Sequence, residues 1–269
     1  MHDSAVGTAG CAEVSLANQV LIKSIKKAAM VLELFSIERP SLSLAEIGKG
    51  LKWNSATTFR ICTTLASCRL LERIDNRYRL GISIAQLNRV LVTTMDIRKE
   101  GFEFLRYLAT EVKHSSYLMV KSGNRMVCID RVPGIFIVQA LSLEIGDSLP
   151  LYRGGGPTAV LAYQPLEVQK EILSDLFQQE RFSAETEKRW WLRLEKIRQQ
   201  GYSVSRDEVH KGTAAVGAPI FNTSGDAWAS ISVGGVTKGF STKSIPKIAN
   251  EVVHAARTLS RRLGYDGPR

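Results

Sequence analysis

The sequence predicts an α+β protein, with a small helical module near its N-terminus and a larger C-terminal domain built on an antiparallel sheet. Three observations lead to this fold class. Residues 24–80 show three helical patterns followed by a hairpin pattern. Residues 21–81 hold eleven Lys and Arg residues against five Asp and Glu residues, which is typical of a nucleic-acid module. Beyond residue 97, short apolar strand patterns are interspersed with helical ones.

The first two helices of the module can be placed from apolar spacing and capping residues. A helix is predicted from Ser24 to Phe35, with Ser24 as its N-cap and Ile25 among its periodic apolar residues. Ser43 is expected to cap a second, short helix, in which Glu46 at the third position completes a capping box.

The third helix is predicted from about Ser55 to Cys68, and it carries no carboxylate. On a helical wheel, an apolar stripe that includes Phe59 faces the core. The opposite face holds hydroxyl side chains and Arg60. A carboxylate on that face would repel a phosphate backbone, so its absence favours a helix that contacts nucleic acid.

A two-stranded hairpin is predicted from residues 70–74 and 77–80, with a turn at Asp75 and Asn76. Three helices followed by this hairpin make a winged helix-turn-helix. Its third helix would enter the major groove, where Arg60 can donate two hydrogen bonds to a guanine edge. The opposing interpretation is a solvated helix face beside a surface hairpin. The residues expected to contact double-stranded DNA are Ser43, Ser55, Thr57, Thr58, Arg60, Thr64, Arg73, Arg77 and Arg79.

A linker helix is predicted over residues 82–94, with Ile84, Leu87, Val90 and Leu91 at helical spacing. Such an apolar stripe is typical of a helix that pairs with a partner, and a homodimer is the expected reason. The alternative is packing of this stripe against the chain's own C-terminal domain.

The C-terminal domain is predicted to mix strands and helices on an antiparallel sheet. The expected strands are 117–121, 126–131, 136–141, 214–221 and 228–233. The expected helices are 98–113, 157–163, 166–177, 184–200 and 244–263.

Two of these strands have one apolar face and one face of small residues. In TAAVGAPIF, Thr213, Ala215 and Gly217 share one face, and WASISVGG places Ser230, Ser232 and Gly234 together. A face this small leaves room for a ligand. The segment GDSLPLYRGGGPTAVLAY could complete a pocket, because Gly155 and Gly156 would present backbone N–H groups to an anion such as a carboxylate. The alternative is a flexible surface loop and a sheet covered by helices.

Composition also limits which partner, cellular compartment and cofactor this protein can be expected to have. The net charge of +10 favours a polyanionic partner, and no apolar run approaches the length of a membrane span. The first twenty residues, which contain no Lys or Arg, are expected to be a flexible tail rather than a signal peptide, so a cytoplasmic protein is predicted. No zinc or other metal site and no cofactor are expected. The four cysteines, which have no C-x-x-C spacing, are Cys11, Cys62, Cys68 and Cys128.

From about Ser24 to Gly264, the chain resembles the IclR family of bacterial transcriptional regulators. The likeness is carried by the third-helix pattern with Arg60, the YRLG wing end at 78–81, LPL at 149–151 before the glycines, GYS at 201–203, DE at 207–208 and API at 218–220. The resemblance implies a winged-helix DNA-binding domain, a linker helix and a GAF-like effector-binding domain. It also implies a dimer or tetramer that acts as repressor, activator or both and responds to small organic acids or aromatic compounds.

On this basis the chain divides into a tail (1–22), a DNA-binding domain (23–81), a linker helix (82–96) and an effector-binding domain (97–265). Members of the family often have a more polar pocket than Ala215, Ser205 and Gly234 would make here. The resemblance therefore implies a larger or less polar effector, such as an aromatic or branched acid. The residues it assigns to the effector site are Leu141, Leu149, Gly155, Gly156, Ser205, Thr213, Ala215, Ser232 and Gly234, with Asp207 as an alternative to Ser205.

Two other functions remain open at this point. One is an enzyme with a nucleic-acid module, in which Asp207, Glu208 and His210 would form a metal or acid–base cluster, although no motif marks a nucleophile. The other is a non-specific nucleic-acid-binding protein whose second domain only oligomerises. We expect a regulator rather than an enzyme.

Overall fold

The computed structural model describes residues 22–135 and 143–267. The chain divides into two compact units, and the boundary falls between Leu91 and Val92. Within the described residues, no helix is both long enough and apolar enough to cross a membrane.

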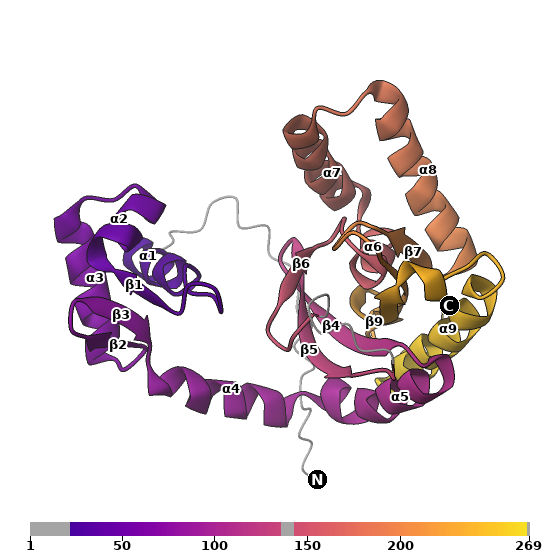
Figure 1. Cartoon of the computed structure of the whole chain (residues 1–269), viewed down its shortest axis with the longest axis horizontal. Helices are drawn as coiled ribbons and strands as arrows, with labels where there is room; N and C mark the ends of the chain where they lie inside the picture. The colour runs from indigo at the N-terminus through magenta and orange to yellow at the C-terminus, as the bar shows by residue number, and fades with distance from the viewer. Residues whose placement is uncertain (1–21, 136–142, 268–269) are drawn as a thin grey trace, which may run out of the picture. The chain divides into compact units, whose positions relative to one another are not determined.

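The N-terminal unit is a winged helix-turn-helix, as predicted (Figure 1). Its small sheet has the order β1-β3-β2, and both pairings are antiparallel. The strand β1 was not predicted, because three residues are too short to show an alternating pattern. The helices are α1 (Lys23–Leu32), α2 (Leu44–Leu51) and α3 (Ser55–Ser67), and the strands are β1 (Ser41–Ser43), β2 (Leu71–Ile74) and β3 (Arg77–Leu80).

The helix caps agree with the sequence at α2 but not at α1. The predicted capping box is present, since the Ser43 hydroxyl accepts from the Glu46 N–H and the Glu46 carboxylate accepts from the Ser43 N–H. The N-cap of α1 is Ile22 rather than Ser24, because the helix begins one residue before the serine. Ile25, which was expected on the buried face of α1, is 64% exposed.

The capping carboxylate of α2 should make the N-terminal unit sensitive to acid. The hydrogen bond from the Ser43 N–H and the nearby Arg77 guanidinium lower the pKa of Glu46 from 4.5 to about 2. A carboxylate whose pKa is lower in the folded state stabilises the fold above its unfolded pKa and loses this effect as it becomes protonated. We therefore expect α2 to lose stability between about pH 4.5 and pH 2.

Hydrogen-exchange protection factors of the α2 amides would measure this effect. The matched control is Glu46→Gln, because glutamine can still cap the helix but does not titrate. The wild-type protection should fall more steeply with acid than that of the variant. Equal slopes would assign the acid sensitivity to other carboxylates.

The C-terminal unit contains a six-stranded antiparallel sheet in the order β6-β5-β4-β9-β8-β7, which confirms the predicted α+β class. The short strands β6 and β7 were not predicted, and the predicted strand 136–141 lies outside the described residues. The strands are β4 (Ser115–Ser122), β5 (Arg125–Val132), β6 (Ser148–Pro150), β7 (Ser203–Arg206), β8 (Thr213–Phe221) and β9 (Ala227–Val236).

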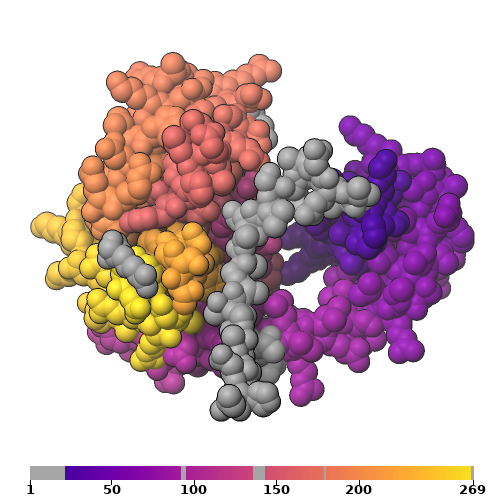
Figure 2. Space-filling view, turned by 180° about the vertical axis from the view of Figure 1, so that it is seen from behind, coloured from indigo at the N-terminus to yellow at the C-terminus, as the bar shows by residue number. Residues whose placement is uncertain are grey.

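Helices cover both faces of this sheet (Figure 1). The helices α5 (Asp96–Val112) and α9 (Ile245–Arg262) pack on one face, and α6 (Gly155–Leu161) packs on the other. The helices α7 (Leu166–Glu180) and α8 (Ala184–Gln200) form a lobe of this unit, drawn in salmon and orange in Figure 2. The remaining elements are α4 (Ile82–Thr94), which spans the boundary between the units, and the 3-10 turn η2 (Thr237–Gly239).

The two faces of β8 and β9 are used as the sequence predicted. The apolar face is fully buried against α5 and α9, and it includes Val216, Ile220, Ile231 and Val233. The strands pair as the expected antiparallel hairpin partners, so the small residues of β8 lie beside those of β9 on the opposite face. The face of small residues is therefore the one on which α6 packs.

Candidate functional site

The exposed side of α3 presents Arg60 to solvent. Within the described part of the chain, its guanidinium has neither an ion-pair partner nor a hydrogen-bond acceptor. Asn54 caps the helix by accepting from the Thr57 N–H at 2.8 Å. Because α3 contains no carboxylate, the positive charge of Arg60 is not neutralised along its own helix.

Thr58 requires a correction. It was expected to contact DNA, but its side chain is fully buried. Its Oγ1 donates to the carbonyl oxygen of Asn54 at 2.9 Å, so burial of the hydroxyl is compensated. An added Cβ on Gly48 would lie only 3.3 Å from this oxygen, which shows how closely Thr58 approaches α2. Thr58 is a packing residue between the two helices.

Phe59 is the second correction in α3. It was expected in the apolar stripe that faces the core, but it is 48% exposed. It does not belong to the core cluster of this unit, which centres on Val31, Ile47, Cys62 and Leu65. Other side chains form the core of this unit, and the phenyl ring of Phe59 lies on the solvent side of the helix.

The other predicted DNA-contacting hydroxyls lie at or beside the exposed surface of the helix-turn-helix. Ser55 and Thr64 are exposed, and Thr57 and Ser43 are half-buried. The Thr64 hydroxyl donates to the Arg60 carbonyl oxygen, and the Ser43 hydroxyl already serves the α2 cap. Each of these oxygens has a second hydrogen-bonding direction that remains available to a ligand.

The three wing arginines are held by the protein itself. Arg73 donates to the Asp75 carbonyl and to Asn76. Arg77 pairs with Glu46 at 3.0 Å, and Arg79 pairs with Glu72 at 2.9 Å. These contacts orient the three guanidinium groups on the wing, and the two carboxylates offset part of the charge of Arg77 and Arg79. Arg60 therefore differs from the wing arginines in having its full donor set available.

A basic groove, which was not predicted from the sequence, runs between α1 and α3. Its rims carry Lys23 and Lys27 from α1 and Thr57, Arg60 and Thr64 from α3. No carboxylate lies among the residues that line it. The lysines were missed because α1 was interpreted only as a core helix. The clustering of charge in residues 21–81 was the available signal.

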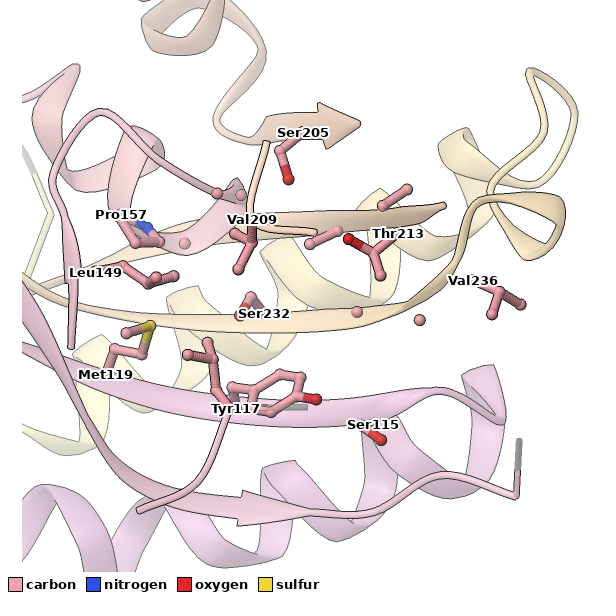
Figure 3. Close-up of a pocket in the computed structure, with 18 residues that line it drawn as sticks. Ser115, Tyr117, Met119, Leu149, Pro157, Ser205, Val209, Thr213, Ser232 and Val236 are labelled. Carbon is pink, nitrogen blue, oxygen red and sulfur yellow. The ribbon is translucent and has the colours of Figure 1, made fainter. Parts of the chain in front are cut away.

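A separate cavity lies in the C-terminal unit, between the small face of β8 and β9 and the start of α6 (Figure 3). It offers about 80 Å³ to the centre of a water-sized sphere, several times what one water molecule needs. Eight of the predicted effector residues line it: Leu149, Gly155, Gly156, Ser205, Thr213, Ala215, Ser232 and Gly234. Leu141 lies outside the described residues.

Several lining residues come from segments that the sequence analysis did not connect with the site. Tyr117 and Met119 extend from β4, the strand beside β9, and Val209 comes from the loop between β7 and β8 (Figure 3). Burial raises the pKa of Tyr117, and its phenol can donate a hydrogen bond to a ligand. The apolar run at 117–121 predicted a strand, but its place next to β9 was not visible in the sequence.

Glycines allow α6 to lie directly on the sheet. A Cβ on Gly217 would stand 2.5 Å from the Cα of Gly156 and 2.6 Å from the carbonyl carbon of Gly155. A Cβ on Gly156 would stand 2.6 Å from the Ser230 hydroxyl. The N–H groups of Gly155 and Gly156 are in the first turn of α6, where no intrahelical acceptor exists. The same two glycines therefore allow close packing and carry N–H groups without an intrahelical acceptor.

The acidic pair Asp207 and Glu208 is used structurally. The Asp207 carboxylate accepts from the Gly212 N–H at 2.6 Å and does not line the cavity, so its expected role as an effector contact is a correction. Glu208 accepts from the Gly154 N–H at 2.9 Å and from Arg193 at 2.7 Å. The N–H of Gly154 is therefore already hydrogen-bonded to the Glu208 carboxylate and is not available to a ligand. Among the residues described, no group of three or more His, Cys, Asp or Glu side chains could hold a metal ion.

Comparison with known proteins agrees with both halves of this architecture. The family model "IclR helix-turn-helix domain" matches residues 24–75, and "Bacterial transcriptional regulator IclR C-terminal" matches residues 90–261. The regulator KipR of Bacillus subtilis is 29% identical over 90% of this chain and 98% of its own length. The regulator Rv1719 of Mycobacterium tuberculosis is 30% identical over 74% of this chain and 77% of its own.

Solved structures show the same fold. The crystal structure of the Thermotoga maritima IclR is 25% identical, with a TM-score of 0.61 over 90% of this chain and 99% of that one. An IclR family regulator from Brucella abortus superposes with a TM-score of 0.79 at 20% identity, over 93% of this chain and 95% of that one. Both domain models together cover most of the sequence. The chain therefore belongs to the IclR family of DNA-binding bacterial transcriptional regulators.

Proposed function

We propose that this protein binds a specific operator in double-stranded DNA through α3 and the wing, under the control of a small organic-acid or aromatic effector. The observation that supports the effector half is the cavity under α6, which is lined by eight of the residues that the family resemblance assigns to the effector site. The proposed domains are the DNA-binding domain 23–81, the linker 82–96 and the effector-binding domain 97–265, in a cytoplasmic protein.

The lining of the cavity supports the class of ligand. None of the described side chains around it is charged. Hydroxyl groups of Tyr117, Ser205, Thr213 and Ser232 face it together with Leu149 and other apolar groups. A carboxylate here would be held by hydroxyls and by the first N–H groups of α6 rather than by an ion pair. The remainder of the ligand would be apolar, as in an aromatic or branched acid.

A homodimer, or a dimer of dimers, is part of this proposal. The apolar residues of α4 are exposed in the described structure, at 59% for Leu87, 62% for Val90 and 58% for Leu91. Packing of this stripe against a second copy would remove it from water. The symmetry of such a dimer predicts an inverted repeat in the operator.

Selection of bound duplexes from a random library, at near-physiological salt, tests the DNA half of the proposal. We expect an enriched inverted repeat. Binding without enrichment, which fades as salt rises, would instead favour the non-specific nucleic-acid-binding protein, because only phosphate contacts would then be made.

Thermal unfolding in the presence of a ligand panel tests the effector half. The panel pairs aromatic and branched carboxylic acids with their neutral amides. A ligand that binds only the folded state stabilises by roughly 2.7 kcal/mol at a hundred times its Kd. An acid that raises the unfolding temperature and also changes operator affinity would support the proposal. No stabilisation across the panel would favour a C-terminal domain that only oligomerises.

The basic groove between α1 and α3 leads to a prediction about Lys23. If Lys23 contacts a DNA phosphate, Lys23→Gln should lower affinity for operator and random duplexes alike. It should also reduce the slope of log K against log salt by about one unit per contact. Titrations at several salt concentrations would measure this slope.

Lys26 supplies the matched control for this measurement. It lies on the same helix and carries the same charge, but it does not line the groove. We expect Lys26→Gln to leave the slope close to that of the wild type. Equal slopes for the two variants would show that the groove makes no phosphate contact and that only net charge matters.

A further inference from the structure

The exposed face of α3 contains one large apolar side chain, that of Phe59. The ring is 48% exposed, and the core cluster of the unit forms without it. Within the described residues, no aromatic ring or cation packs against this phenyl group. Covering an exposed phenylalanine with another surface lowers the free energy, because apolar area is removed from water. The position is therefore suited to a contact that the isolated chain does not make.

The neighbours of Phe59 on the helix indicate what covers it. Ala56 and Thr63 stand three and four positions away, so they share its side of α3, and Arg60 is adjacent. All three are exposed, and α3 carries no carboxylate. This surface is electrostatically complementary to DNA, and it belongs to the helix that a helix-turn-helix places in the major groove.

The major groove offers an apolar partner for such a ring. Hydrogen-bonding groups line most of each base edge, and the thymine C5-methyl group is the apolar feature. Burying the phenyl ring against a methyl group removes apolar surface of both from water. Burying it against the donors and acceptors of a guanine, cytosine or adenine edge would leave polar groups without partners.

We propose that Phe59 is a specificity-determining residue that reads a thymine methyl group in the operator, next to the base that Arg60 contacts. This inference rests on the proposed operator binding through α3. It adds a large apolar contact to a recognition surface that otherwise consists of hydroxyls, small methyl groups and one guanidinium. Phe59 would select thymine over uracil, a distinction that Arg60 and the threonine hydroxyls have no means to make at that position.

A methyl-deletion cycle tests this assignment with the full-length protein and the operator obtained by selection. Each thymine of a half-site is replaced in turn by deoxyuridine, symmetrically in both half-sites, which removes only the methyl group. Dissociation constants are then measured for the wild type, for Phe59→Ala and for Ile37→Ala. Ile37 is the control, because it is 75% exposed and lies outside α3.

We expect one thymine whose replacement weakens wild-type binding about fourfold per half-site, as the loss of one buried methyl group implies. Phe59→Ala should weaken binding to the intact operator at least as much. The same deoxyuridine replacement should then have no further effect on that variant. Ile37→Ala should keep the full response to the replacement. Because Phe59 is exposed and outside the core, the variant should unfold at close to the wild-type temperature.

Three results would overturn the inference. Deoxyuridine effects that are the same for the wild type and for Phe59→Ala at every position would show that the ring contacts no methyl group. A change in the oligomeric state of Phe59→Ala, together with such additive effects, would assign the ring to a contact between copies. A wild type that binds no duplex specifically would overturn the proposed function and this inference together, so the two failures can be told apart.

Discussion

Replacing Arg60 by alanine is expected to abolish specific operator binding while leaving the fold intact. A bidentate contact from arginine to a guanine edge is worth about 1–3 kcal/mol of discrimination. Two symmetric half-sites would double this to about 2–6 kcal/mol, so affinity for the operator should fall roughly 30-fold or more. The Arg60 side chain is exposed and has no partner in the described structure. The free energy of unfolding should therefore change by less than about 0.5 kcal/mol.

Arg39→Ala is the matched control for this variant. Arg39 is also exposed, and it lies in the segment between α1 and β1, outside α3 and the wing. Both variants lose one positive charge, so both should show the same small loss on random DNA. Competition binding with operator and scrambled duplexes would separate the two effects. If Arg60→Ala lost no more specificity than Arg39→Ala, α3 would not present this face to the bases.

The second large effect is expected in the C-terminal unit, where Gly217→Ala should strongly destabilise the fold. The added methyl group would stand 2.5 Å from the Cα of Gly156 and 2.6 Å from the carbonyl carbon of Gly155. These are backbone atoms, so α6 would have to move away from β8 as a whole. Overpacking of this kind costs about 3 kcal/mol. That loss corresponds to a decrease in Tm of roughly 6–12 °C for a domain of this size.

Gly234→Ala is the control that tests whether a methyl group added anywhere on the small face of the sheet would destabilise the fold. The added Cβ would lie 3.5 Å from the side chains of Ala215 and Tyr117, which is ordinary van der Waals contact. We expect a change of less than about 1 kcal/mol for this variant. Scanning calorimetry of the two proteins without ligand measures the difference. Equal transition temperatures would contradict the close packing of α6 on β8.

The fold of both units followed from local patterns because those patterns are strong. The capping box at Ser43, the period of α3 and the two-residue turn at Asp75 each identify an element within a few residues. The strands that escaped prediction, β1, β6 and β7, are three or four residues long. Strands this short are stabilised by the partner that they pair with, and three or four residues are too few to show a pattern of their own.

In the candidate site, too, some features were visible in the sequence and others depended on contacts between distant segments. The small face of β8 and β9 was evident from alternation alone, and the cavity lies against it. The contribution of Tyr117 was not evident, because it depends on β4 pairing with β9 across more than a hundred residues. Glu208 could be recognised as a notable carboxylate, but its use as the acceptor for Gly154 and Arg193 depends on three separate segments meeting.

The sequence by itself determined the order of elements, the basic character of the first unit, the small face of the sheet and the family. These properties reside in residue types and their spacing, which the chain carries before it folds. Only the tertiary structure decided that Thr58 is buried and Phe59 exposed. A helical wheel gives the period of α3 but cannot say which arc its neighbours cover. Gly48 leaves a space on α2 that the Thr58 side chain fills, and the phenyl ring of Phe59 is consequently left for another partner.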